Sequence, residues 1–457
     1  MAIKIDFLFI YELKVRELES ICLLKYELER RGYTVAFINT WHSLTHKTPK
    51  YEARVVVAHA LYNDALVNFI SSYVNKINKV INMQWEQIVT NLDEQSNETC
   101  RFISGSAKSA VHLSWGEKNK NKLIKDCGIP AANVKLTGNI TLDFLRREFS
   151  KYYLSRYELF IKYKIPIHKK ICLFISSFSY VDLPKRFAKD DNLKLANDPD
   201  IFIEISRASQ SAILDWLEKI LIKNEEIVFI YRPHPAEATN KKLINLSNKY
   251  PNFLIINDLS VKQWIKTVDL IYTWYSTSLV EVYCCNKPCF ILRPIEIPYN
   301  LELTICSEAK FISNFNEFEK TLYQKKTEFP LQESALLSYC NIDTTKPSYI
   351  KICDVMEEVY KNDCYVFPTL KKNKRNATFS VQNLKQVVGQ SFIYDALEYV
   401  ASNTNLNLGI LNRIRLRKVN NIDTYTLQQQ YKNYVTNDEI NNMVRKIKNI
   451  ISNYPNI

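Results

Sequence analysis

The sequence predicts an α/β protein with two Rossmann-like, doubly wound parallel sheets that face an interdomain cleft, followed by a helical C-terminal appendage. Three observations support this prediction. Short apolar runs alternate with helical patterns, the alternation restarts after a polar connector, and it is lost beyond about residue 344. The 457 residues exceed what one ordinary core holds, and the 46% hydrophobic content supplies enough apolar material for two cores.

The first third of the chain predicts a Rossmann-like domain over residues 1–150. Its first apolar run, Ile3–Ile10, indicates a buried strand, and Val15–Arg31 indicates an amphipathic helix that ends at Gly32. Further strands are expected at Tyr33–Asn39, Val55–Ala58, Lys79–Met83, Val111–Trp115 and Val134–Thr137. Strands that alternate with helices indicate βαβ units and therefore a parallel sheet.

A second Rossmann-like domain is expected over residues 151–345, after the polar connector Tyr153–Lys169. Ala212–Lys223 has a helical pattern. The expected strands are Ile171–Ile175, Ile227–Tyr231, Phe253–Ile256, Leu270–Thr273 and Pro288–Leu292. Two consecutive doubly wound units joined by a linker describe the GT-B architecture. In such sheets ligands bind at the carboxyl ends of the strands, here across the cleft.

Residues 346–457 predict a helical, basic appendage, with helices at Tyr349–Lys361, Phe392–Ser402 and Glu439–Ile451. Two basic runs, Lys371–Arg375 and Arg413–Lys418, lie between these helices. They form either a solvated surface or a docking site for the anionic inner leaflet, where each nearby cation contributes about 1 kcal/mol.

Composition excludes several classes of protein. The formal net charge of +13 favours anionic partners, but RNA-binding signatures are absent and no nucleic-acid partner is expected. The 11 cysteines have irregular spacing and no C-x-x-C, which disfavours zinc sites and a disulfide framework. Asp198-Pro199-Asp200 spells D-x-D but falls in a polar loop, so we expect no metal and no cofactor beyond the donor substrate.

The start of the chain lacks the basic segment and cleavage site of a signal peptide. Apolar stretches also stay well short of the roughly 20 residues that a membrane helix needs. We therefore expect a cytoplasmic protein that is soluble or peripheral at the inner face of the membrane.

The strongest candidate for a binding loop directly follows the strand Ile227–Tyr231 and runs Arg232-Pro233-His234-Pro235-Ala236-Glu237. The prolines stiffen the loop around His234, and Arg232 offers a planar fork of donors that suits phosphate. Donors placed here would stabilise the charge that a departing phosphate gains. We assign Arg232, His234, Pro235 and Glu237 to nucleotide binding, and His234 also to catalysis. The alternative is a surface turn.

A second candidate loop follows the strand Leu270–Thr273 and contains Ser276, Thr277 and Ser278. Hydroxyls and unpaired backbone N–H groups at the start of a helix form an anion site. Ordinary helix capping needs only one hydroxyl, and three are present. We assign all three to nucleotide binding.

Carboxylates in the first domain are candidates for the general base. Glu86 follows the strand Lys79–Met83 and is expected to face the cleft, although it could instead form a structural ion pair. Glu12 and Glu17 follow the first strand and are the competing carboxylates, whereas Arg16 could line an acceptor site.

The two loops resemble the HP and Ser/Thr motifs of bacterial sialyltransferases, polysialyltransferases and Kdo transferases, which are GT-B-type enzymes that use CMP-activated sugars. The first domain also looks like bacterial surface-carbohydrate biosynthesis proteins at Glu12–Glu17, Gln84–Gln87, Ser114–Gly116 and Leu136–Asn139. CDP-glycerol polymerases and nucleotide-sugar 2-epimerases carry related His-Pro loops. One departure concerns Trp85-Glu86-Gln87, where the polysialyltransferase pattern has an acidic pair followed by Gly.

The resemblance implies that His234 and the Ser/Thr cluster hold the phosphate of CMP. It further implies transfer of an acidic sugar, of sialic type or Kdo, to a glycan or lipid-linked glycan of a capsule or lipopolysaccharide. One alternative is phosphotransfer from CDP-glycerol or CDP-ribitol, as in teichoic-acid synthesis. Another is a non-catalytic scaffold in polysaccharide assembly.

Overall fold

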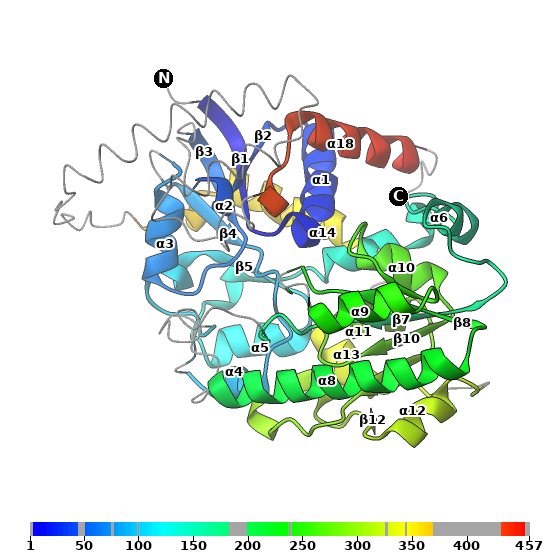
Figure 1. The fold of residues 1–457 in the computed structure, drawn as a ribbon. Coiled ribbons are helices and arrows are strands. Elements are labelled where there is room, and N and C mark those ends of the chain that lie inside the picture. Colours follow the sequence, from blue (N-terminus) through cyan, green and yellow to red (C-terminus); the bar gives the residue numbers. More distant parts are fainter. Residues whose placement is uncertain are drawn as a thin grey trace, which may run out of the picture.

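A computed structural model describes residues 3–43, 51–74, 77–97, 99, 101–181, 199–235, 237, 240–324, 328–342, 345–368 and 431–452. Both basic runs of the tail, the predicted helix Phe392–Ser402 and Asp198 lie outside these residues. The described chain forms two α/β halves, one above the other in Figure 1.

The N-terminal half contains a six-stranded parallel sheet with the strand order β2-β1-β3-β4-β5-β6. Its strands are β1 (Ile3–Tyr11), β2 (Val35–Asn39), β3 (Tyr51–Ala58), β4 (Lys79–Asn82), β5 (Val111–Ser114) and β6 (Val134–Leu136). Its helices are α1 (Lys14–Arg30), α2 (Thr40–Ser43), α3 (Asp64–Ser71), α4 (Asn91–Gln95) and α5 (Glu117–Lys125). All six strands coincide with predicted apolar runs.

The C-terminal half contains a second six-stranded parallel sheet with the order β12-β11-β10-β7-β8-β9. Its strands are β7 (Lys170–Ile175), β8 (Ile227–Arg232), β9 (Phe253–Ile255), β10 (Leu270–Thr273), β11 (Cys289–Leu292) and β12 (Phe311–Ile312). Its helices are α6 (Arg156–Lys162), α8 (Pro199–Lys223), α9 (Lys241–Lys249), α10 (Val261–Thr267), α11 (Leu279–Cys284), α12 (Phe315–Thr321) and α13 (Glu333–Tyr339). Only β12 was not predicted, because two residues cannot show an alternation.

Alternate residues of each strand enter different cores, as the two-residue repeat of a strand requires. In β1, Phe7 and Phe9 pack beneath α1, whereas Leu8 and Ile10 pack on the opposite face with α3 and α5. In the C-terminal half, one core lies against α10, α11 and α13, and the other against α8, α9 and α12. Both sheets are therefore covered on both faces.

The end of the chain returns to the N-terminal half. Helix α14 (Ser348–Lys361) and helix α18 (Asn437–Ile451) both pack on α1, as the yellow and red ribbons of Figure 1 show. Met356 and Ile447 are fully buried in the same core as Phe7 and Phe9. The predicted appendage thus contains two helices that complete the N-terminal core.

The two halves are also joined by a short antiparallel bridge between Thr90 and Leu303. The backbone N–H of Asn91 donates to the carbonyl of Glu302 at 2.9 Å. The carboxylate of Glu302 pairs with Arg293 at 2.8 Å, just after β11. The end of β11 is thereby tied to the start of α4.

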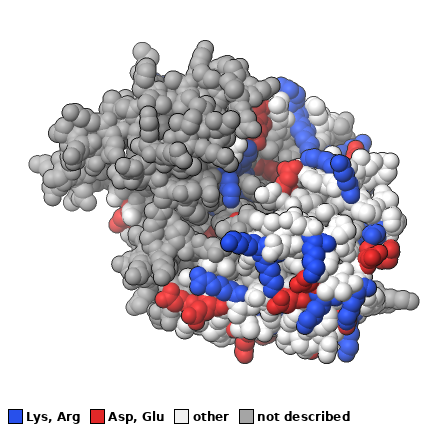
Figure 2. Space-filling view, in the orientation of Figure 1, with Lys and Arg blue, Asp and Glu red and all other residues white. Residues whose placement is uncertain are grey.

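Basic and acidic side chains are interspersed over the described part of the face in Figure 2. Among the described residues, no helix is both long and apolar enough to cross a membrane. Nor does this part of the chain contain a group of three or more His, Cys, Asp or Glu side chains that could hold a metal ion.

Candidate functional site between the two sheets

The loop after β8 is held from inside by Glu237, whose side chain is buried. Its carboxylate accepts hydrogen bonds from the hydroxyls of Ser176 at 2.5 Å and Tyr231 at 2.6 Å, and from the backbone N–H of His234 at 3.0 Å. Burial raises the pKa of Glu237, and these hydrogen bonds partly offset that effect. Glu237 therefore positions the loop, and a carboxylate at this place does not suit a phosphate contact.

Arg232 points away from the loop that it precedes. Its two outer nitrogens donate to the carbonyl oxygens of Asp258, at 2.8 Å, and Leu259. Leu259 has a left-handed backbone with a φ of 64°, so this guanidinium braces a tight turn before α10. Burial lowers the pKa of Arg232 to about 10, and nearby Asp258 acts in the opposite direction. The predicted phosphate grip of Arg232 does not agree with this placement.

His234 lies where the two halves meet. Burial lowers its pKa to about 4, Glu86 acts to raise the pKa, and Arg16 and Lys432 act to lower it. The imidazole is therefore neutral near pH 7 and offers one donor and one acceptor rather than a positive charge. Since Glu86 and Arg16 belong to the N-terminal half, their effect on the pKa of His234 indicates that this loop lies near the residues that follow β1 and β4.

The Ser/Thr loop lies on the same edge of the sheet as His234. Thr273, Ile175 and Arg232 are aligned across β10, β7 and β8, so the two loops start about 10 Å apart, or two strand spacings. Ser276 and Ser278 are half-buried and Thr277 is exposed. The Ser276 hydroxyl accepts the backbone N–H of Ser278 at 3.2 Å. The structure thus brings the two predicted loops to one side of one sheet.

In the N-terminal half, Glu17 is fully buried. Its carboxylate accepts the backbone N–H groups of Glu12 at 3.0 Å and Leu13 at 3.2 Å, and it pairs with Arg16 at 2.7 Å. These contacts close the turn between β1 and α1 and aim Arg16. Glu17 therefore shapes the site rather than reacting in it.

Glu86 bridges two arginines. It pairs with Arg16 and, at 2.7 Å, with Arg101. Its position follows a tight turn at Gln84, whose φ is 46°. Burial raises the pKa of Glu86, but Arg101 and Arg16 outweigh this and lower the pKa to about 2. A carboxylate held so firmly in its ionised form is a weak proton acceptor.

Glu12 has the opposite character. Burial raises its pKa, while His59 and Arg16 act to lower it, and Arg16 donates to it at 3.2 Å. The positive charges do not cancel the effect of burial, and the pKa of Glu12 stays above its ordinary value. Glu12 is therefore more basic than Glu86. Such a carboxylate is better matched to proton transfer near neutral pH.

His59 follows β3 directly and was not among the site residues predicted from sequence. Ile10, Ala58 and Asn82 are aligned across β1, β3 and β4, so polar residues after these strands gather at one edge. His59 is 9% exposed, and its Nδ1 is buried with no hydrogen-bond partner among the residues that the structure describes. A polar residue directly after the apolar run Val55–Ala58 was the signal that could have found it.

Similarity to known proteins was found among solved structures only. No family model matches the sequence, and no curated protein matches it either. UDP-GlcNAc 2-epimerase from Neisseria meningitidis is 14% identical, with a TM-score of 0.50 over 79% of this chain and 100% of that chain. A variant of the wall teichoic acid polymerase TagF is 15% identical, with a TM-score of 0.51 over 79% of this chain and 90% of that chain.

The chain has the GT-B fold. This confirms the predicted fold class, including the C-terminal helices. At such low identity the likeness to these proteins establishes the GT-B fold alone, and no family model supports a specific relation to sialyltransferases or Kdo transferases.

Proposed function

We propose that this GT-B protein is a glycosyltransferase that moves an acidic sugar of sialic or Kdo type from a CMP-activated donor to a cell-surface glycan. The observation that carries the proposal is that His234, in the C-terminal half, lies close enough to Glu86 and Arg16 of the other half for their charges to act on its pKa. A donor phosphate between His234 and the hydroxyls of Ser276, Thr277 and Ser278 would place its sugar opposite the carboxylates of that half.

The chemistry requires a proton acceptor and a stabilised leaving group. In the proposed step Glu12 takes the proton of the acceptor hydroxyl while the acceptor oxygen bonds to the anomeric carbon. The bond from that carbon to the CMP phosphate oxygen breaks, and CMP leaves with both bond electrons. Neutral His234 donates a hydrogen bond to the departing phosphate, whose charge grows in the transition state. The orphaned Nδ1 of His59, near Glu12, is available to hydrogen-bond the acceptor hydroxyl.

A thermal-shift panel of CMP, CDP, UDP, CMP-sugars and UDP-GlcNAc tests the donor class. A nucleotide at 100 times its dissociation constant adds about 2.7 kcal/mol of stability. We expect CMP and a CMP-sugar to stabilise the protein, and transfer to an acceptor glycan to be lost in His234→Ala. Transfer that survives His234→Ala undiminished would overturn the proposal.

A second candidate is phosphotransfer from CDP-glycerol or CDP-ribitol. The observation that favours it is a solved structure of TagF, soaked with CDPG, with a TM-score of 0.50 and 14% identity. Stabilisation by CDP-glycerol without stabilisation by CMP-sugars would select this reaction. A protein that binds none of the nucleotides would favour a non-catalytic scaffold.

A further inference from the structure

The donor site as predicted from sequence contains no available cation. Arg232 spends both outer nitrogens on backbone carbonyls, and the low pKa of His234 keeps it neutral. Arg16 is shared among three carboxylates, of Glu12, Glu17 and Glu86. Arg101 is likewise paired with Glu86. A phosphate beside His234 would therefore gain from a further positive charge that no carboxylate neutralises.

The structure brings one such cation from the far end of the chain. The ammonium of Lys432 donates to the carbonyl of Pro235 at 2.8 Å, across 197 residues of sequence. Its charge also acts on His234. An ammonium group has three donors, and Pro235 accepts only one of them. The other two can serve a ligand held in the same loop.

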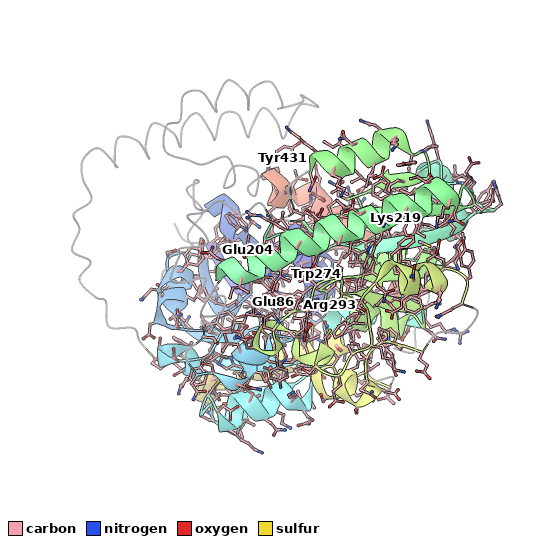
Figure 3. The ribbon with its side chains drawn as sticks, turned by 60° about the horizontal axis from the view of Figure 1, so that its bottom comes forward. Glu86, Glu204, Lys219, Trp274, Arg293 and Tyr431 are labelled. Carbon is pink, nitrogen blue, oxygen red and sulfur yellow. The ribbon has the colours of Figure 1, made fainter. Side chains whose placement is uncertain are left out.

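The segment that carries Lys432 is anchored on the N-terminal half. Asn433 is buried, and its Oδ1 accepts the backbone N–H of Lys14 at 2.8 Å. The Lys14 ammonium donates to the carbonyl of Tyr434 at 3.2 Å and pairs with Glu439 at 2.7 Å. In Figure 3, Tyr431 marks the start of this described segment, which continues into α18. Lys432 is thus held by one half while it contacts the other.

We infer that Lys432 is a donor-binding residue whose ammonium contacts the phosphate of the nucleotide held by the His234 loop. This inference rests on the proposed function and adds to it a residue that neither half supplies by itself. A compact ammonium suits a phosphate as a point charge, whereas the planar guanidinium of Arg232 is already committed. The C-terminal segment then contributes to the site together with the two halves.

The test compares CMP with cytidine, which lacks the phosphate, by calorimetric titration of the full chain. Lys432→Gln should weaken CMP binding about tenfold, as loss of a charged hydrogen bond implies, and leave cytidine binding unchanged within about twofold. Lys432→Arg should retain most of the CMP affinity. Lys448→Gln, an exposed position on α18, is the matched control and should bind both ligands as the wild type does.

Two results would overturn the inference alone. One is unchanged CMP affinity in Lys432→Gln. The other is an equal loss for CMP and cytidine, which would mean that Lys432 only holds Pro235 in place. A wild-type protein that binds neither CMP nor any other nucleotide would instead overturn the proposed function and, with it, this inference.

Discussion

Glu12 and Glu86 share Arg16 yet differ in what they can do. Glu86 has a second arginine, Arg101, and its pKa falls to about 2, whereas burial raises the pKa of Glu12. A base with a very low pKa gains little by accepting a proton in the transition state. Glu86 was the carboxylate favoured from sequence, and its ion pairs now suit it better to orienting Arg16 and Arg101.

Substitution of the two glutamates by glutamine separates these roles. Glu12→Gln should lower kcat by about 10²–10⁴-fold, the range for loss of a general base. Glu86→Gln should lower it by less than about tenfold, because only the orientation of the arginines changes. The pH profile of kcat/KM is the second measurement. Activity should fall as the pH is lowered and Glu12 is protonated. The midpoint of this fall should lie above the pKa of an ordinary glutamate, which is about 4.3.

The reverse order of the two effects would return the base role to Glu86. The residual activity of Glu12→Gln should no longer fall at low pH in the same way. An unchanged fall would contradict the assignment of Glu12 as the base. Gln is nearly isosteric with Glu, so circular dichroism of both variants serves as the folding control.

At the scale of the element, two contacts hold the described part of the loop after β8 at adjacent residues, His234 and Pro235. Glu237 holds its backbone at His234, and Lys432 holds it at Pro235. Arg232, at the end of the strand, braces the neighbouring turn at Asp258 and Leu259 instead. If this loop binds the donor as proposed, contacts that already hold His234 and Pro235 lower the entropy that binding costs.

Arg232→Met tests whether this arginine braces the fold or binds the donor. The variant leaves the Leu259 carbonyl without its guanidinium partner, and we expect a loss of about 1–3 kcal/mol in the free energy of unfolding. CMP affinity should change little. Arg445→Met, on the exposed face of α18, is the matched surface control. A large loss of CMP affinity at unchanged stability would support the phosphate role predicted from sequence.

At the scale of the whole molecule, the returning C-terminal segment links the core of one half to the binding loop of the other. Helices α14 and α18 bury their apolar faces on α1, and the residues just before α18 reach the His234 loop. Stability of the N-terminal half and organisation of the site are therefore coupled through residues beyond 430.

Ile447→Ala should show that α18 belongs to the core. Its side chain is fully buried, and truncation of such an isoleucine costs about 2–5 kcal/mol. Ile222→Ala, whose side chain is 63% exposed, should change stability by less than about 0.5 kcal/mol. Urea denaturation of both variants gives the comparison. Equal stability of the two variants would mean that α18 is a dispensable appendage.

The apolar runs of the sequence were enough to predict the two sheets, their parallel strands and the positions of both candidate binding loops. These features are local, because apolar runs, the residues after them and the stiffening prolines are neighbours in the chain. That is why the strand ends at Arg232 and Thr273 were predicted closely.

The partners of the charged side chains are visible only in the folded structure. The contacts of Arg232 with Leu259, of Glu86 with Arg101, and of Lys432 with Pro235 join residues that are far apart in sequence. A pKa depends on burial and on every nearby charge, neither of which a local pattern records. Packing was therefore needed to distinguish Glu12 from Glu86, to reveal His59, and to bring a lysine from the end of the chain to the loop around His234.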